Sequence, residues 1–160
     1  MKIVTFIGTR PELIKMSEFL RKADSIFEHT LIHTGQNYSS NLSDIFFEDL
    51  NLRRPDHWLD VASDGADMTL GNIINKSYAI LKEIRPDAIL VYGDTHSCLS
   101  AISAKRLGIT VFHIEAGNRS FDKHLPEEMN RKIVDHISDI NICLSANAKQ
   151  YLIGEGMRGD

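Results

Sequence analysis

Cysteine is scarce, basic charge is not in excess and no long apolar run is present, and each of these absences excludes a class of protein. The two cysteines are Cys98 and Cys143. Both lie in apolar runs, with no Cys-x-x-Cys pair and no histidine pair at zinc spacing nearby, which favours buried thiols in a reducing compartment. The 18 Lys and Arg against 22 Asp and Glu give a net charge of -4. This mild acidic excess argues against nucleic acid as a partner.

Targeting signals and nucleotide-binding fingerprints are absent as well. The amino-terminal run Ile3–Ile7 is too short for the apolar region of a signal peptide, and no stretch approaches the roughly 20 apolar residues that cross a membrane. We therefore expect a cytoplasmic protein with no membrane partner. The sequence contains neither GxGxxG nor GxxxxGK(S/T), so it predicts neither a standard dinucleotide fingerprint nor a P-loop.

Apolar runs alternate with helical periodicity along the whole chain, whose 160 residues have the length of about one domain. The pattern predicts strands over residues 2–8, 29–34, 88–92, 109–114 and 140–144, and helices over residues 11–20, 40–50, 68–84, 99–107, 126–139 and 146–154. Residues 51–65 read as a loop in which Trp58 is a buried anchor. This alternation predicts an α/β fold, a parallel sheet with helices on both faces.

Ligands of such sheets bind outside the carboxyl ends of the strands. We therefore expect the segments that follow four strands to converge on one cleft, namely residues 8–12, 34–38, 93–97 and 115–119. Asn37 and Tyr38, in the second of these segments, are plausible sugar contacts, although turn chemistry explains them equally well.

The first and third segments carry candidate ligand-binding groups. Arg10 stands beside a helix start, where free N–H groups and the helix dipole favour a phosphate or diphosphate; a solvated arginine is the equally weighted alternative. Lys15 follows about one turn later, a position where lysine is usually solvated. Asp94 closes a buried strand and is either a helix N-cap or a catalytic carboxylate. Thr95 and His96 are weaker candidates for ligand contact.

A dense group of charges lies between Val111 and Arg131. Glu115 closes an apolar run, so partial burial is expected to raise its pKa toward the range useful for general acid or base catalysis. The structural alternative is an ion pair between Glu115 and Arg119. Downstream of this group, Asp135 and His136 are interpreted as surface or interface residues, and His113 as a satisfied core histidine.

Two adjacent glutamates follow the proline that opens the next helix. Acidic residues are favoured at a helix N-terminus, which explains one of them. Arg131 is spaced i, i+4 from Glu127 and i, i+3 from Glu128. An ion pair therefore can hold one glutamate while the other faces the cleft.

Five segments together resemble motifs of the non-hydrolysing UDP-N-acetylglucosamine 2-epimerase family, in the family's order: FIGTRPELIK, HTGQNY, YGDTHSCLSA, HIEAGNRSF and PEEMNRKIVDHISD. The fourth and fifth look most like the capsule-type branch that forms UDP-N-acetyl-L-fucosamine. The resemblance implies a glycosyltransferase-B-like enzyme with two Rossmann-like domains, of which residues 1–160 match the first. The second, which supplies most contacts to UDP, is not matched, so we expect this chain alone to have little or no epimerase activity.

The chemistry that the resemblance implies is inversion at C2 of a UDP-sugar by elimination and re-addition of UDP. The family's catalytic carboxylates fall on Asp94, Glu115 and Glu127, without an assignment of acid and base. Substrate-binding positions are expected at Arg10, Lys15, Thr95, His96, Arg119, Glu128 and Arg131. No metal or other cofactor is implied, a homodimer is suggested, and the segment TGQNYSS differs from that of allosterically activated members.

Two other interpretations fit parts of the sequence. A glycosyltransferase-B nucleotide-sugar transferase shares the architecture, although it does not normally need three carboxylates around one sugar. A small flavodoxin-like or receiver-like binding module, which is not an enzyme, explains the length and the acidic strand ends without a second domain.

Overall fold

Six parallel strands form the centre of the fold, in the order β3-β2-β1-β4-β5-β6. The structure is a computed structural model that describes residues 1–36 and 46–159. The candidate contacts Asn37 and Tyr38, and most of the helix predicted over residues 40–50, lie outside the described residues. The strands are β1 (Lys2–Ile7), β2 (Glu28–His33), β3 (His57–Trp58), β4 (Ala88–Tyr92), β5 (Thr110–Ile114) and β6 (Ile140–Ile142).

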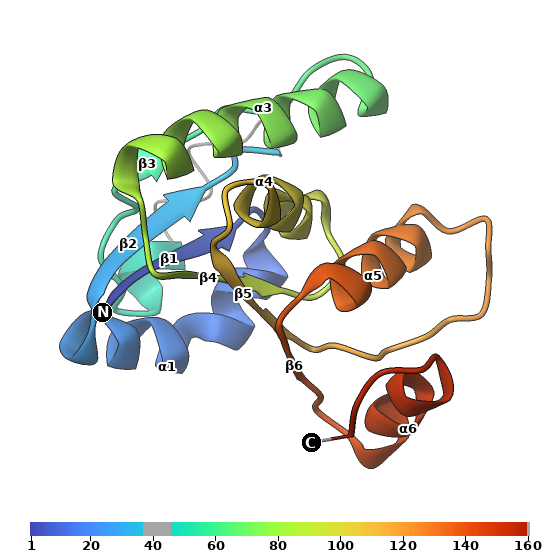
Figure 1. Ribbon diagram of the computed structural model, residues 1–160. Helices are drawn as coiled ribbons and strands as arrows, with labels where there is room; N and C mark the ends of the chain where they lie inside the picture. The colour runs from blue at the N-terminus through green and yellow to red at the C-terminus, as the bar shows by residue number, and fades with distance from the viewer. Residues whose placement is uncertain (37–45, 160) are drawn as a thin grey trace.

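Helices connect these strands and cover both faces of the sheet. They are α1 (Arg10–Ile26), α3 (Ala66–Ile84), the short 3-10 helix η1 (His96–Leu99), α4 (Ser100–Arg106), α5 (Pro126–Ile137) and α6 (Ala146–Gly154). Figure 1 shows α1 on one side of the sheet and α3 and α4 on the other. The predicted α/β, Rossmann-like arrangement is thereby confirmed. Among the helices of the described residues, none combines the length and the apolarity needed to cross a membrane.

Alternating side chains of the strands build two cores. Val4, Ile89 and Val111 belong to the core beneath α3, α4 and α5. Ile7 and Leu90 face the opposite way and pack with the apolar stripe of α1. Since successive strand residues point to opposite faces, a strand that is buried on both sides needs a continuous apolar run. The run AILVY of β4, buried at all five positions, is of this kind.

The strand order reverses between β1 and β4, because β2 and β3 extend the sheet on one side of β1 and β4 to β6 extend it on the other. Ligands of open α/β sheets bind at such a switch point. The register places Tyr92 of β4 level with Ile114 of β5, and the Gly93 N–H donates to the Ile114 carbonyl at 2.9 Å. The residues that follow β1, β4 and β5 therefore emerge at the same edge.

Three sequence-based interpretations are wrong. Trp58, in a predicted loop of which only residues 57–58 form a strand, β3, is not buried. It is 37% exposed because it lies at an outer strand, where its ring packs against His33 at 4.2 Å between centroids. Cys98 is buried as expected, but Cys143 is only partly buried because it follows the outer strand β6. Asp135 is not a surface residue; its side chain is fully buried.

Candidate active site

A cavity of about 400 Å³ opens at the switch point, between the ends of β1, β4 and β5. It joins three of the four segments expected to converge. The fourth reaches the same edge, because a Cβ at Gly8 would meet Thr34 and Gln36. The cavity is lined by Thr9, Pro11, Glu12, Lys15, Tyr92, Gly93, Asp94, Thr95 and Glu115.

Glu115 pairs with a cation from the opposite end of the chain. The Lys15 ammonium on α1 donates to Glu115 Oε2 at 3.0 Å, and the Tyr92 hydroxyl donates to the same oxygen. The Lys15 ammonium also lies 5.2 Å from the centroid of the Tyr92 ring. The alternative ion pair between Glu115 and Arg119 does not form, because the Arg119 guanidinium is held elsewhere. Glu115 is therefore presented to the cavity beside a lysine and a phenol.

The expected rise of the Glu115 pKa is wrong in sign. Burial by itself raises the pKa of this carboxyl, but the hydrogen bonds from Tyr92 and Lys15 outweigh burial and lower it. The same contacts act on the partners: burial and the bond to Glu115 raise the pKa of Tyr92 to about 12, and the bond to Glu115 raises that of Lys15. Glu115 is thus an ionised carboxylate, able to accept a proton.

The backbone of Glu115 is held in the left-handed region, with φ at 69°. A residue with a Cβ pays about 1–2 kcal/mol for this conformation, and such strain concentrates at functional sites. Glycine would relieve it, yet the chain places a carboxylate here. The left-handed turn is therefore a second feature of this position, independent of its charge.

Asp94 meets Arg131 at the neighbouring strand end. The guanidinium of Arg131, on α5, forms an ion pair with the Asp94 carboxylate, and the side-chain amide of Asn130 donates to the Asp94 carbonyl at 2.8 Å. Thr95, and not Asp94, is the N-cap of η1. The helix α5 therefore fixes both the backbone and the side chain of Asp94.

The two adjacent glutamates of α5 have opposite environments. Glu127 is exposed, whereas Glu128 is 1% exposed and accepts from the Ser120 N–H at 2.9 Å and from Arg131 at 3.2 Å. Arg131 thus holds one glutamate, as the spacing predicts, whereas the expectation that the other faces the cleft stays a prediction. Glu128 closes the loop that precedes α5 and has no open face toward a ligand.

Glu12 is the buried carboxylate that sequence analysis missed. It is 2% exposed and accepts from the Gly8 N–H at 2.6 Å and the Thr9 N–H at 3.3 Å. Its other oxygen accepts from the hydroxyls of Thr95 and Ser97, the latter at 3.0 Å. Glu12 therefore ties the turn after β1 to the turn after β4. The signal for it is the spacing Thr9-x-x-Glu12, typical of a capping box.

The other expected contacts lie at differing depths. Arg10 is exposed, with its guanidinium 4.2 Å from the centroid of the Phe46 ring, and His96 is partly buried in η1. The Arg119 side chain is 0% exposed and engages Asp135 and Glu155, so it faces the protein interior instead of the cavity. Among the described residues, the cavity lining includes neither Arg10 nor Glu127. Within residues 1–36 and 46–159, no three His, Cys, Asp or Glu side chains gather as metal ligands.

Comparison with known proteins gives a consistent result. Residues 20–160 match the family model described as UDP-N-acetylglucosamine 2-epimerase. The solved structure of a UDP-N-acetylglucosamine 2-epimerase from Rickettsia bellii is 52% identical in sequence, with a TM-score of 0.93 over 99% of this chain and 43% of that one.

Two further relatives differ in what their names say they bind or act on. A Methanocaldococcus jannaschii UDP-GlcNAc 2-epimerase, solved in complex with UDP-GlcNAc and UDP, is 39% identical with a TM-score of 0.95, over 99% of this chain and 44% of that one. A UDP-2,3-diacetamido-2,3-dideoxy-D-glucuronate 2-epimerase from Pseudomonas aeruginosa is 38% identical over 159 residues, 98% of this chain and 45% of the relative. The chain thus spans less than half the length of each.

Proposed function

Because this chain belongs to the UDP-N-acetylglucosamine 2-epimerase family, we propose that it supplies the sugar-facing carboxylates of an enzyme that inverts C2 of a UDP-linked 2-acetamido sugar. The observation that carries the proposal is the cavity at the switch point, where ionised Glu115 lies against Lys15 with Asp94 on the same wall. A second domain, which the longer relatives have room for, would complete the site on the UDP side.

The C2 hydrogen of the sugar is not acidic, so the reaction needs an elimination. A carboxylate takes the C2 proton while the C1–O bond to UDP breaks, and the electron pair of the C–H bond becomes the C1–C2 double bond of a glycal. UDP then adds back to C1 through the same phosphate oxygen, and a proton enters C2 from the opposite face. Atoms and electrons balance without any redox partner, and general acid–base groups with a diphosphate-holding cation are sufficient.

The proposed roles combine the family resemblance with the environments of the side chains. Glu115 and the exposed Glu127 are the candidates that remove and return the C2 proton, with Asp94 as the third carboxylate of the site. Lys15 and Arg10 are the cations that we propose hold the departing diphosphate; Lys15 lines the cavity. Thr95, His96 and Arg131 remain proposed substrate contacts. Arg119 and Glu128, first expected at the substrate, support the loop between β5 and α5 instead.

The finer identity of the reaction is part of the proposal. We take UDP-N-acetylglucosamine and UDP-N-acetylmannosamine as the first pair to test, because the R. bellii and M. jannaschii relatives carry the name of that substrate. A UDP-linked 2-acetamido-2,6-dideoxy-L-hexose is the second, from the resemblance of the Glu115 and α5 segments to the capsule-type branch. A cytoplasmic homodimer that serves capsule or surface polysaccharide synthesis is the expected setting.

The test is made on the complete gene product in D₂O, with each UDP-sugar and no acceptor. We expect deuterium at C2 of both epimers by NMR, and a large loss of that signal in Glu115→Gln and in Glu127→Gln. Near wild-type exchange and turnover in both variants would refute the assignment of the carboxylates. Robust turnover by the isolated 160-residue chain would refute the need for a second domain.

A further inference from the structure

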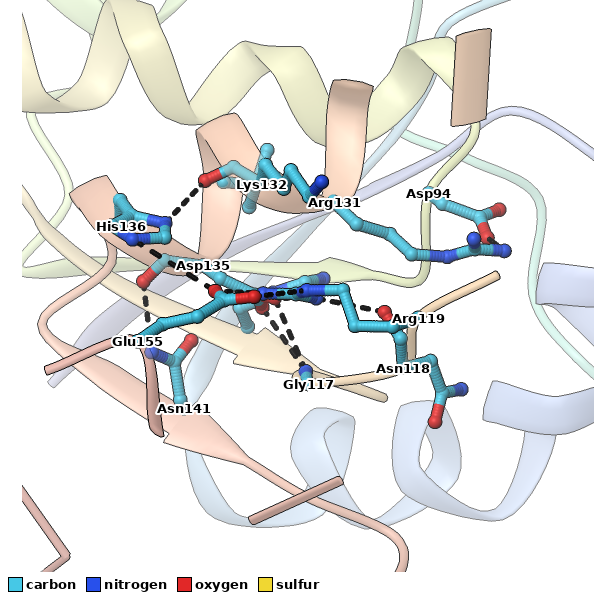
Figure 2. A network of polar contacts seen from close by, with 12 residues as sticks. Asp94, Gly117, Asn118, Arg119, Arg131, Lys132, Asp135, His136, Asn141 and Glu155 are labelled. Carbon is cyan, nitrogen blue, oxygen red and sulfur yellow. Dashed lines mark hydrogen bonds and ion pairs between the residues drawn. The ribbon is translucent and has the colours of Figure 1, made fainter. Parts of the chain in front are cut away.

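A fully buried network of charges lies behind the strand ends that carry Asp94 and Glu115. Its centre is Asp135 of α5, and Figure 2 shows dashed lines that run from this cluster to Gly117. The Asp135 carboxylate accepts from Arg119 Nη1 at 2.7 Å and from the Gly117 N–H at 3.2 Å, and it lies 2.8 Å from Nδ1 of His113. The side chains of Asp135, His113 and Arg119 are all 0% exposed.

The hydrogen-bond partners of His113 fix its role in this network. Its Nε2 lies 2.7 Å from the carbonyl oxygen of Gly93, and a carbonyl can only accept. Its Nδ1 faces the Asp135 carboxylate, which already accepts from two other donors. The His113 ring therefore bridges the Gly93 carbonyl and the Asp135 carboxylate. Burial raises the pKa of Asp135, but the bonds from His113 and Arg119 outweigh burial and lower it, which agrees with an ionised acceptor.

Two branches of the network end on backbone within two residues of a site carboxylate. Gly93 directly precedes Asp94, and Gly117 stands two residues after the strained Glu115. Gly117 has φ at 81°, and a Cβ there would approach the Ala148 carbonyl oxygen to 2.3 Å. Only glycine therefore fits this turn without a shift of the backbone. Asp135 is thus bonded to both strand ends at once, directly to one and through His113 to the other.

We propose that Asp135 is a positioning residue of the candidate site: it holds the Glu115 turn through the Gly117 amide and the Asp94 turn through His113. This rests on the proposed function, because positioning has a kinetic meaning only if Glu115 and Asp94 act on substrate. Misplacement of a catalytic group by about 1 Å costs on the order of 10²-fold in rate. The network sets the relative placement of two such groups.

The chain offers a matched control in Asp139. This aspartate follows the same helix and accepts from the Val111 N–H at 2.8 Å and from Lys105 at 2.6 Å. It therefore also joins α5 to β5, but at the end of the strand away from the cavity. Asp135→Asn and Asp139→Asn each remove one negative charge that accepts from a backbone N–H and from a basic side chain. Asp139 is more exposed, at 39%, and only Asp135 touches the strand ends of the site.

The experiment compares both variants in the complete gene product. For Asp135→Asn we expect kcat to fall about 10²-fold with KM within about twofold of wild type, and for Asp139→Asn both constants close to wild type. Backbone hydrogen exchange, read by mass spectrometry, should accelerate around residues 93–95 and 115–118 in Asp135→Asn, and only around residues 109–111 in Asp139→Asn.

Equal kcat values in the two variants, or unchanged exchange around residues 93–95 and 115–118, would overturn the proposal. If Asp135→Asn does not fold, His113→Gln takes its place, since it cuts the branch to Gly93 and leaves the bonds of Asp135 to Gly117 and Arg119. Faster exchange at residues 93–95 alone with a lower kcat then supports the proposal, and wild-type kinetics opposes it. A wild-type enzyme without epimerase activity would defeat the proposed function. The hydrogen-exchange comparison would still show whether Asp135 holds the turns at residues 93–95 and 115–118.

Discussion

Replacement of Glu128 by glutamine should destabilise the fold in a way that depends on pH. Burial raises the pKa of Glu128, but the Ser120 N–H and hydroxyl and the cations Arg131 and Lys132 outweigh burial, and its pKa falls to about 2 from an ordinary value of 4.5. With its side chain 1% exposed, solvent does little to screen these contacts. Glutamine keeps the shape of the side chain, but it carries no charge and turns an NH₂ group toward donors.

The size of the effect follows from the shift. A difference of about 2.5 pKa units, at about 1.4 kcal/mol each, corresponds to about 3 kcal/mol of stability at neutral pH. Because the pKa is lowered in the folded state, this stability is present above the unfolded pKa of 4.5 and is lost as pH falls toward the folded value of about 2. The gap between wild type and Glu128→Gln should therefore shrink to about 2 kcal/mol near pH 3.5.

Urea unfolding followed by circular dichroism at several pH values measures this gap. Glu127→Gln is the control, since its side chain is the exposed neighbour on the same helical turn; we expect its stability to stay within about 0.5 kcal/mol of wild type, while its activity falls. Equal stability of wild type and Glu128→Gln at pH 7, or a gap that widens in acid, would contradict the reasoning.

Two further substitutions separate strain and burial from charge. At Glu115, where φ is 69°, we expect urea unfolding to show Glu115→Gly about 1 kcal/mol more stable than Glu115→Ala. Turnover assays should find both variants inactive. Equal stabilities of the two variants would show that the turn relaxes. At Glu12, burial raises the pKa of the carboxyl above its ordinary value of 4.5, despite four hydrogen-bond donors. The wild-type protein therefore loses stability as pH rises from 4.5, the unfolded pKa, through the higher pKa of the folded state. Glutamine can accept from the backbone and donate to the Thr95 and Ser97 hydroxyls, so we expect Glu12→Gln to be at least as stable as wild type at pH 7 and to lose this advantage near pH 4. A clear deficit at pH 7 would be evidence against this account.

The elements of the fold could be predicted because their signals are local. The continuous apolar run 88–92 became β4 with the same bounds, and Pro126 opens α5 where acidic residues follow. The short strand β3 escaped prediction because two residues carry no periodicity; its place at the edge comes from pairing with β2.

The candidate site, like the fold, could be predicted from the sequence only in part. The order of elements predicts that Asp94, Glu115 and Lys15 lie near strand ends, because the carboxyl ends of parallel strands share one edge of the sheet. The partners of these groups did not follow from it. Sequence spacing suggested Arg119 for Glu115, whereas the sheet brings in Lys15, 100 residues away, and reverses the expected pKa shift.

By itself, the sequence determined the class of fold, the edge of the sheet at which the chemistry gathers, and the fact that one of two adjacent glutamates would be held. Only the tertiary structure decided which carboxylates are buried and what they meet. Asp135 lies beside His136 on an amphipathic helix and looks like a surface or interface residue, yet it is buried because His113, Gly117 and Arg119 contact it from β5 and the loop that follows. Hydrophobic periodicity depends on residues that are close in sequence. Charge pairing depends on distances between side chains that are far apart in sequence, and the order of the strands in the folded sheet sets these distances.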